Sequence, residues 1–347
     1  MKLEKETPVP LYFQLINQLR SNLLNTLKPG ALIPPERVLC EQFQVSRITV
    51  RKALEQLTVN GEIYKLHGKG TFKSFNRPNG VKELVYVICN TSMITSPGRE
   101  KIIRSLAETA EKRGYHLVIR GYHSSGDMQD MQGLRDFAVQ GINGGLLVSV
   151  QELTNADILS LQQTRIPCVF MNQEKGYSVH CDYIAAGRLA AEWANRKKFR
   201  RIALLLPSRK LHDMRNYLTG FQDALNQKVS SFAIFETHYC RQTAAEAVTK
   251  LLKKKNALPN AVICGDDLEA AGAADALNEA GMRGRIPVCG VNNSYLASEM
   301  QFSSIDLNLE ERSRQAAELL ADILEGKAPA SPYTIKIQPV FKERRVK

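Results

Sequence analysis

Four polar residues between positions 47 and 52 have side chains suited to contacting nucleic acid. They are Arg47, Thr49, Arg51 and Lys52. An arginine presents parallel N–H donors that match O6 and N7 of guanine, whereas lysine and threonine also contact phosphate groups. A similar run occurs on ordinary solvated helix faces, so its meaning depends on the elements that position it.

Hydrophobic periodicity around these residues predicts three helices. The first is expected over 9–27, and a second, short helix begins at Pro34-Pro35-Glu36, where proline is tolerated in the first turn. After a bend, Ser46 can cap a third helix through its hydroxyl group. The apolar stripe of the third helix consists of Val50, Ala53, Leu54 and Leu57. This stripe directs the four polar residues outward.

A hairpin is predicted directly after the third helix. Extended runs at 62–66 and 71–74 flank His67-Gly68-Lys69-Gly70, whose glycines permit a tight turn. Three helices followed by a hairpin form the layout of a winged helix-turn-helix.

The charge distribution agrees with a nucleic-acid-binding module at this end of the chain. Residues 1–80 carry 12 Lys and Arg against 6 Asp and Glu, so they hold half of the net charge of +12 within 347 residues. A basic module followed by a larger, nearly neutral body is typical of DNA-binding proteins.

The run from Pro34 to Phe72 resembles the DNA-binding domain of the GntR family of bacterial transcription regulators. It contains Glu-Arg after proline, a Ser-Arg-x-Thr-Val-Arg start of the recognition helix and a Gly-x-Gly-Thr wing, in family order. The similarity covers residues 10–74 and implies the following DNA contacts: Arg37, Ser46, Arg47, Thr49, Arg51, Lys52, His67, Gly68 and Lys69. We also expect Lys52 and Lys73 to contact phosphate. The DNA-binding domain is placed at 1–74 and a linker at 75–83.

Beyond the linker, apolar strands alternate with amphipathic helices. Eight strands are predicted, at 84–89, 116–119, 145–150, 167–171, 202–206, 232–235, 261–264 and 287–291. The helices are expected at 100–113, 127–140, 185–197, 214–226, 243–255 and 268–280. This alternation predicts an α/β domain of two doubly wound lobes, each with about four parallel strands.

This second region, 84–340, resembles the effector domain of LacI/GalR repressors, which has the two-lobed fold of type I periplasmic binding proteins. The similarity includes the runs 110–115, 141–147, 181–187, 198–204, 261–267 and 290–294. It implies a small-molecule site where strand ends converge, and the effector-binding residues Arg99, Tyr122, Asn172, Asp182, Arg215, Asp266 and Asn292.

The usual sugar-binding set of that family is altered at three places. Gly98-Arg99 replaces an aromatic pair, Tyr217 stands where an arginine is usual, and Asn292 replaces an aspartate. Either the pocket takes another sugar or a more anionic ligand, or effector binding has weakened.

The remaining patterns favour a regulator over an enzyme. The seven cysteines are scattered singly, and neither a metal-binding motif nor a phosphate loop is evident, so no metal or cofactor is expected. The N-terminus lacks a secretory signal and no apolar run is long enough to span a membrane, which predicts a cytoplasmic protein. We expect a homodimer on an inverted-repeat operator, controlled by a carbohydrate-related effector. An enzyme or a two-lobed solute-binding protein without a DNA role is the alternative.

Overall fold

The computed structural model describes two compact units, one up to Lys82 and one from Glu83 onward. The described residues are 10–28, 30–59, 62–66, 69–73, 82–88, 96–121, 144–150, 153, 158, 161, 166–225, 231–253 and 258–344. The predicted helix at 127–140 and residues 75–81 of the expected linker lie outside them. The linker boundaries stay a prediction, although a strand already begins at Lys82.

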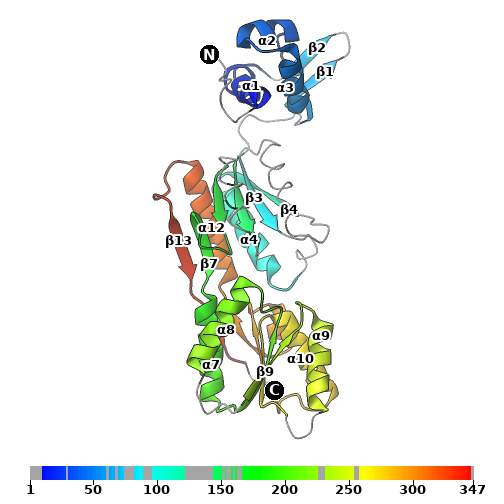
Figure 1. Cartoon of the computed structure of the whole chain (residues 1–347), viewed down its shortest axis with the longest axis vertical. Helices are drawn as coiled ribbons and strands as arrows, with labels where there is room; N and C mark the ends of the chain where they lie inside the picture. The colour runs from blue at the N-terminus through cyan, green and yellow to red at the C-terminus, as the bar shows by residue number, and fades with distance from the viewer. Residues whose placement is uncertain are drawn as a thin grey trace. The chain divides into compact units, whose positions relative to one another are not determined.

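The first unit has the predicted winged helix-turn-helix layout (Figure 1). Helix α1 (Leu11–Leu19) continues as a π-helical segment, η1 (Arg20–Leu24), and is followed by α2 (Glu36–Phe43) and α3 (Arg47–Val59). Strands β1 (Ile63–Leu66) and β2 (Gly70–Lys73) pair in antiparallel fashion. All four residues of the predicted α3 stripe are buried, which confirms the helical periodicity.

The start of α3 is capped as the sequence predicts. Ser46 Oγ accepts a hydrogen bond from the backbone N–H of Thr49 at 3.2 Å and lies 2.8 Å from the Thr49 hydroxyl group. Gln44 adopts a left-handed conformation with φ of 53°, which ends α2 and turns the chain toward α3. Capping and a left-handed residue therefore fix the sharp bend between the two helices.

Lys73 does not have the phosphate-contacting role that the sequence suggested. Its side chain is only 5% exposed, and its ammonium group donates hydrogen bonds to the carbonyl oxygens of Leu24 at 2.6 Å and Leu27 at 2.7 Å. The ammonium group thus satisfies carbonyl groups that the end of a helix leaves without intrahelical donors. Lys73 ties the hairpin to the first helix instead of facing DNA.

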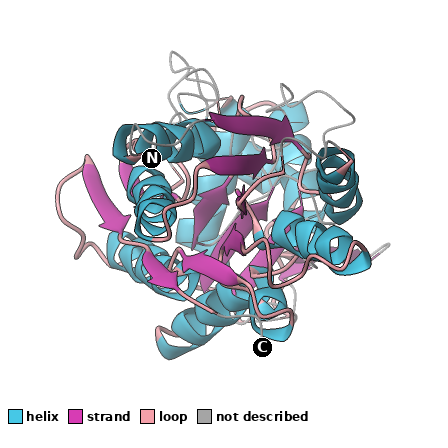
Figure 2. Ribbon diagram, turned by 90° about the horizontal axis from the view of Figure 1, so that it is seen from below, coloured by secondary structure: helices cyan, strands magenta, loops and turns pink. Residues whose placement is uncertain are grey.

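The second unit consists of two lobes, each built around a six-stranded sheet with helices on its faces (Figures 1 and 2). In the first lobe the strand order is β13-β7-β6-β5-β3-β4. The strands are β3 (Lys82–Ile88), β4 (Tyr115–Gly121), β5 (Gly144–Ser149), β6 (Cys168–Phe170), β7 (Tyr177–Cys181) and β13 (Tyr333–Ile337). Helices α4 (Arg99–Lys112) and α12 (Leu309–Leu324) belong to this lobe.

The second lobe has the strand order β14-β12-β11-β10-β8-β9. The strands are β8 (Arg201–Leu206), β9 (Ser231–Glu236), β10 (Ala261–Cys264), β11 (Val288–Val291), β12 (Ser303–Asp306) and β14 (Val340–Lys342). Its helices are α7 (Tyr183–Arg196), α8 (His212–Ala224), α9 (Arg241–Leu252), α10 (Asp267–Glu279) and α11 (Tyr295–Glu299). Only β14 runs antiparallel to its neighbour.

The prediction of about four strands per lobe was too low. All eight predicted strands are present, but β7, β12, β13 and β14 were not anticipated. These four lie near the points where the chain passes from one lobe to the other, and each mixes polar with apolar residues. Near the C-terminal end of the chain, β13 adds an edge strand to the first sheet beside β7, and β14 adds one to the second sheet beside β12.

Two glycines allow α7 and α8 of the second lobe to approach closely. A Cβ atom on Gly187 would lie 1.9 Å from the carbonyl oxygen of Tyr217, and a Cβ atom on Gly220 would lie 1.9 Å from that of Ile184. Larger side chains would therefore separate the two helices. Tyr217, which the sequence placed at a usual effector position, is fully buried in this packing.

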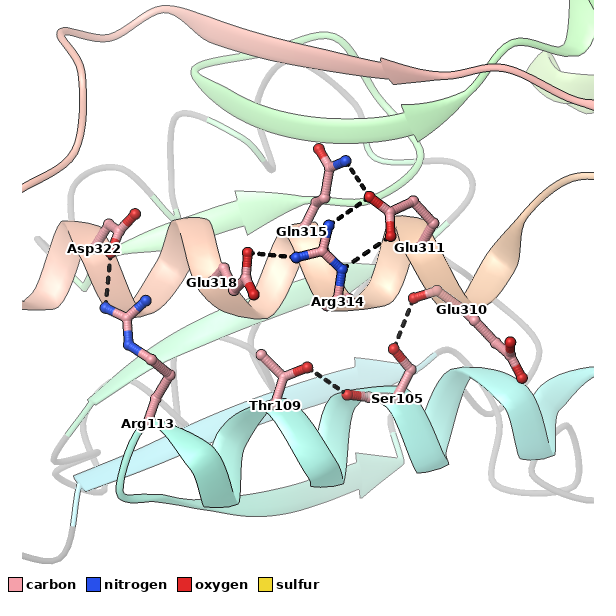
Figure 3. A network of polar contacts seen from close by, with 9 residues as sticks. All are labelled: Ser105, Thr109, Arg113, Glu310, Glu311, Arg314, Gln315, Glu318 and Asp322. Atoms are coloured by element: carbon pink, nitrogen blue, oxygen red, sulfur yellow. Dashed lines mark hydrogen bonds and ion pairs between the residues drawn. The ribbon is translucent and has the colours of Figure 1, made fainter.

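Polar contacts hold α4 and α12 of the first lobe side by side (Figure 3). Arg113 lies 2.7 Å from Asp322, and the Ser105 hydroxyl group donates to the carbonyl oxygen of Glu310 at 2.7 Å. These contacts fix the two helices that carry Arg99 and Arg312. Among the described helices, none is long and apolar enough to cross a membrane.

Candidate functional site

The exposed face of α3 carries the two arginines that the sequence singled out. The side chains of Arg47 and Arg51 are 73% and 55% exposed, respectively. Both face one carboxylate: Glu36 Oε2 lies 3.1 Å from Arg47 Nε and 3.7 Å from an Arg51 terminal nitrogen. Glu36 belongs to α2, so an acid from the preceding helix orients both guanidinium groups. The arrangement presents two forked donors at the start of a helix.

The other predicted DNA-contacting residues differ in their exposure and in the groups that they contact. Arg37 is 83% exposed and forms an ion pair with Glu41 across one helical turn. Lys52 Nζ lies 4.3 Å from the centre of the Tyr12 ring, so its position is supported by α1. Lys69 is exposed in the hairpin turn, whereas His67 and Gly68 lie outside the described residues.

In the second unit, four side chains from both lobes form an interlobe cluster. Arg99, at the start of α4, donates a hydrogen bond to the Tyr86 hydroxyl group at 2.8 Å. From the second lobe, Asp266 follows β10 and accepts a hydrogen bond from Asn292 Nδ2 at 2.7 Å. The two lobes meet here, since a Cβ atom placed on Gly98 would lie in van der Waals contact with Asn292 Cβ, at 3.7 Å. The structure thus joins three predicted effector residues, Arg99, Asp266 and Asn292.

The electrostatics of this cluster are dominated by burial. Burial raises the pKa of Asp266 to about 6, although hydrogen bonds from Leu268 and Asn292 and the charge of Arg99 act in the opposite direction. Asp266 also caps α10 through a 2.7 Å hydrogen bond from the Leu268 N–H. A carboxyl group with this pKa is mostly ionised at neutral pH and accepts hydrogen bonds, and it becomes a donor as the pH falls below about 6.

A second group, the buried-arginine cluster, was missed by the sequence analysis. Arg312 of α12 is only 5% exposed, and its charge interacts with the carboxyl group of Asp213 of α8, with Tyr183 of α7 and Cys181 of β7 nearby. Within the described part of the chain, Arg312 Nε has no hydrogen-bond partner. Burial raises the pKa of Asp213 to about 6 despite the positive charge of Arg312. A buried charged group with an unpaired donor is a feature of ligand sites.

A sequence signal for Arg312 exists. The residue lies on the buried stripe of α12, three residues after Leu309 and four before Ala316, where a core-facing helix normally carries an apolar residue. A charged residue at such a position requires a polar partner in the fold. Asp213, two residues into α8, gave no comparable signal.

None of the contacts described for the other predicted effector residues connects them to either cluster. Asp182 caps α7 through a 2.9 Å hydrogen bond from Ala185 and lies 3.8 Å from Lys336. Arg215 is exposed on α8 and donates to the carbonyl oxygen of Lys210. Asn172 has a buried Oδ1 that finds no partner among the described residues. Tyr122 lies outside them.

Together, the two clusters combine cations, carboxyl groups and phenol groups from both lobes. Arg99 and Arg312 come from the first lobe, whereas Asp213 and Asp266 come from the second. Such a set can donate hydrogen bonds to, and accept them from, the hydroxyl groups of a small polar molecule.

Two family models match separate parts of the chain. Residues 11–72 match the family described as bacterial regulatory proteins, gntR family. Residues 179–345 match the periplasmic binding protein-like domain.

Two curated relatives and one solved structure illustrate these matches. The chain is 27% identical to an arabinose metabolism transcriptional repressor of Geobacillus stearothermophilus, covering 93% of this chain and 94% of the relative. It is 44% identical over 75 residues to the HTH-type transcriptional repressor NagR of Bacillus subtilis, which covers 21% of this chain and 31% of that protein.

The solved structure of the transcriptional regulator CelR in complex with cellobiose shares the fold. It aligns with a TM-score of 0.66 at 20% identity, covering 90% of this chain and 94% of that one. The chain therefore joins a DNA-binding domain of the GntR family of bacterial regulatory proteins to a two-lobed, periplasmic-binding-protein-like domain.

Proposed function

We propose that this protein is a DNA-binding transcriptional repressor whose operator binding is controlled by a small, neutral, carbohydrate-related effector. The observation that carries the proposal is the combination, in one chain, of two exposed arginines at the start of a recognition helix with polar clusters contributed by both lobes of a binding domain. A regulator of this kind acts in the cytoplasm and is not an enzyme.

The chemistry of the first unit supports specific DNA reading. Arg47 and Arg51 are exposed and oriented by Glu36, so their forked donors are ordered before DNA arrives. Bidentate contacts to guanine contribute about 1–3 kcal/mol of discrimination each. The other exposed cations, such as Arg37 and Lys69, suit phosphate contacts.

The charges of the two clusters favour a neutral effector over an anionic one. Burial raises the pKa values of the two carboxyl groups only to about 6, so both are mostly ionised at neutral pH and balance the charges of the two arginines. A polyhydroxylated molecule satisfies both donors and acceptors without burying an unpaired charge. The similarity to an arabinose metabolism repressor, and the fold shared with a cellobiose-bound regulator, support the same ligand class.

Assembly as a homodimer would supply the specificity that one winged helix lacks. A single recognition helix contacts few base pairs, and a two-fold dimer reads an inverted repeat. Light scattering at micromolar concentration should therefore give twice the mass of one chain. A monomer that binds a single half-site tightly would contradict this assembly.

The DNA arm of the proposal is tested with operator sites selected from a random duplex library. Arg47→Ala and Arg51→Ala should each weaken operator binding by about 1–3 kcal/mol and relax selectivity at one position. Lys28→Ala is the charge-matched control, because Lys28 is exposed just beyond the first helix and not on α3. Wild-type affinity and selectivity in both arginine variants would contradict the assignment of α3.

The effector arm is tested by thermal shift over neutral sugars, sugar acids and sugar phosphates. A bound ligand raises the melting temperature because it stabilises only the folded state. Arg99→Ala and Asp266→Asn should abolish the shift and the DNA response, whereas Arg215→Ala, an exposed arginine outside both clusters, should retain them. A response lost in Arg215→Ala and kept in the other two would place the site elsewhere.

A further inference from the structure

Ile48 is an apolar side chain exposed where the rest of its helix hides such groups. It is 81% exposed, the highest value among the large apolar residues that the structure describes. On the same helix, Val50 and Leu54 are 0% and 2% exposed. The fold therefore gains nothing from burying Ile48, and a polar residue would serve the first unit equally well.

The position of Ile48 places it within the proposed DNA-reading surface. It lies in the first turn of α3, next to Arg47, and precedes Arg51 and Lys52 by three and four residues. Residues at this spacing share one helix face. Recognition helices present their N-terminal residues to base edges in the major groove. Ile48 is thus the apolar member of an otherwise cationic and hydroxylated surface.

We propose that Ile48 determines operator specificity by packing against the C5-methyl group of a thymine. This inference rests on the proposed DNA-binding function and specifies one base, a thymine, in each half-site of the operator. The thymine methyl group is the apolar feature of the major groove, and apolar side chains are its usual partners. Contact removes both groups from water and discriminates T·A from the other base pairs beside the guanine contacts of Arg47 and Arg51.

The conformational properties of Ile48 suit this role. A β-branched side chain in a helix has one strongly preferred χ1 rotamer, so little entropy is lost when it docks against a base. Its exposure also makes substitution a clean test, because the buried stripe of α3 does not depend on it. The variant Ile48→Ala should therefore have the same melting temperature as the wild type.

The experiment is a double-mutant cycle between the protein and the DNA. Operators are first selected from a random library with the full chain, and each thymine is then replaced singly by deoxyuridine, which lacks only the methyl group. For one thymine per half-site, the replacement should weaken wild-type binding about three- to tenfold. Ile48→Ala should weaken binding of the unmodified operator by a similar factor and lose no more on the deoxyuridine operator. The variant Ile48→Val should keep most of the wild-type preference for the operator that carries the methyl group.

The outcomes separate this inference from the function on which it rests. If selection yields an operator but no thymine methyl group shows coupling to Ile48, the proposed contact is overturned and the DNA-binding function stands. The same holds if deoxyuridine weakens the wild type and Ile48→Ala equally. If selection yields no operator, the proposed function fails, and the Ile48 contact fails with it.

Discussion

Asp267 should make the stability of the second lobe depend on pH in an unusual direction. This aspartate is fully buried at the start of α10 and accepts hydrogen bonds from the Ser294 N–H at 2.6 Å and the Ser304 hydroxyl group at 2.7 Å. Burial raises its pKa from 3.8 to about 7, with the neighbouring Asp266 acting in the same direction. The folded state therefore binds a proton that the unfolded state releases.

The sign follows from proton linkage. Because the folded pKa is raised above the unfolded value, the free energy of unfolding increases as pH falls through 7 and levels off below 3.8. Between pH 8 and pH 5.5, a pKa of about 7 contributes about 2 kcal/mol of added stability at the lower pH. Asn at this position keeps the size of the side chain and removes the titration.

The assay is urea unfolding at several pH values, followed by fluorescence of Trp193. This residue is the one tryptophan of the chain and is buried in α7 of the same lobe. The free energy of unfolding of the wild type, relative to that of Asp267→Asn, should increase by about 2 kcal/mol as the pH falls from 8 to 5.5. Glu279→Gln, at an exposed position of α10, is the matched control.

The comparison between variants isolates Asp267 from other buried acids. Burial also raises the pKa values of Asp213 and Asp266 to about 6, so the wild type and the variant share their contribution. His180 acts in the opposite sense below its usual pKa, because burial lowers its pKa. Parallel stability curves for the wild type and Asp267→Asn would refute the reasoning.

Three further substitutions test the packing and electrostatics of the two units. Lys73→Met should destabilise the first unit by about 1–3 kcal/mol in calorimetry, because two helix-end carbonyl groups lose their donor; an unchanged transition would contradict this role. Gly187→Ala should destabilise the second lobe by about 3 kcal/mol or more in urea unfolding, since the added methyl group meets the Tyr217 carbonyl oxygen, and a neutral result would mean that the helices can separate freely. Glu36→Gln should lower the ratio of operator to random-DNA affinity by up to about fivefold, because its exposed ion pairs contribute about 1 kcal/mol or less. The ratio is measured by gel-shift titration at matched salt, and a ratio equal to that of the wild type would contradict the orienting role of Glu36.

Local patterns were sufficient to predict the winged helix and the α/β alternation. The stripe beginning at Val50 and the cap at Ser46 depend on neighbours within one or two helical turns, and both are confirmed. The apolar runs of the eight predicted strands are equally local signals. The four other strands were missed because each mixes polar with apolar residues, as in Tyr177–Cys181 and Ser303–Asp306, and none is a continuous apolar run. In addition, β13 and β14 pair with β7 and β12, which lie earlier in the chain.

The sequence by itself determined which elements form and which arginines are outward on α3, because periodicity, capping and family motifs act over short distances along the chain. The tertiary structure alone decided the partners of buried polar groups. It placed the Lys73 ammonium group on the end of the first helix and brought Arg312 beside Asp213, a residue 99 positions earlier in the chain. Such pairings depend on which helices meet across a core, and burial then compels each charge to find a polar partner wherever the fold supplies one.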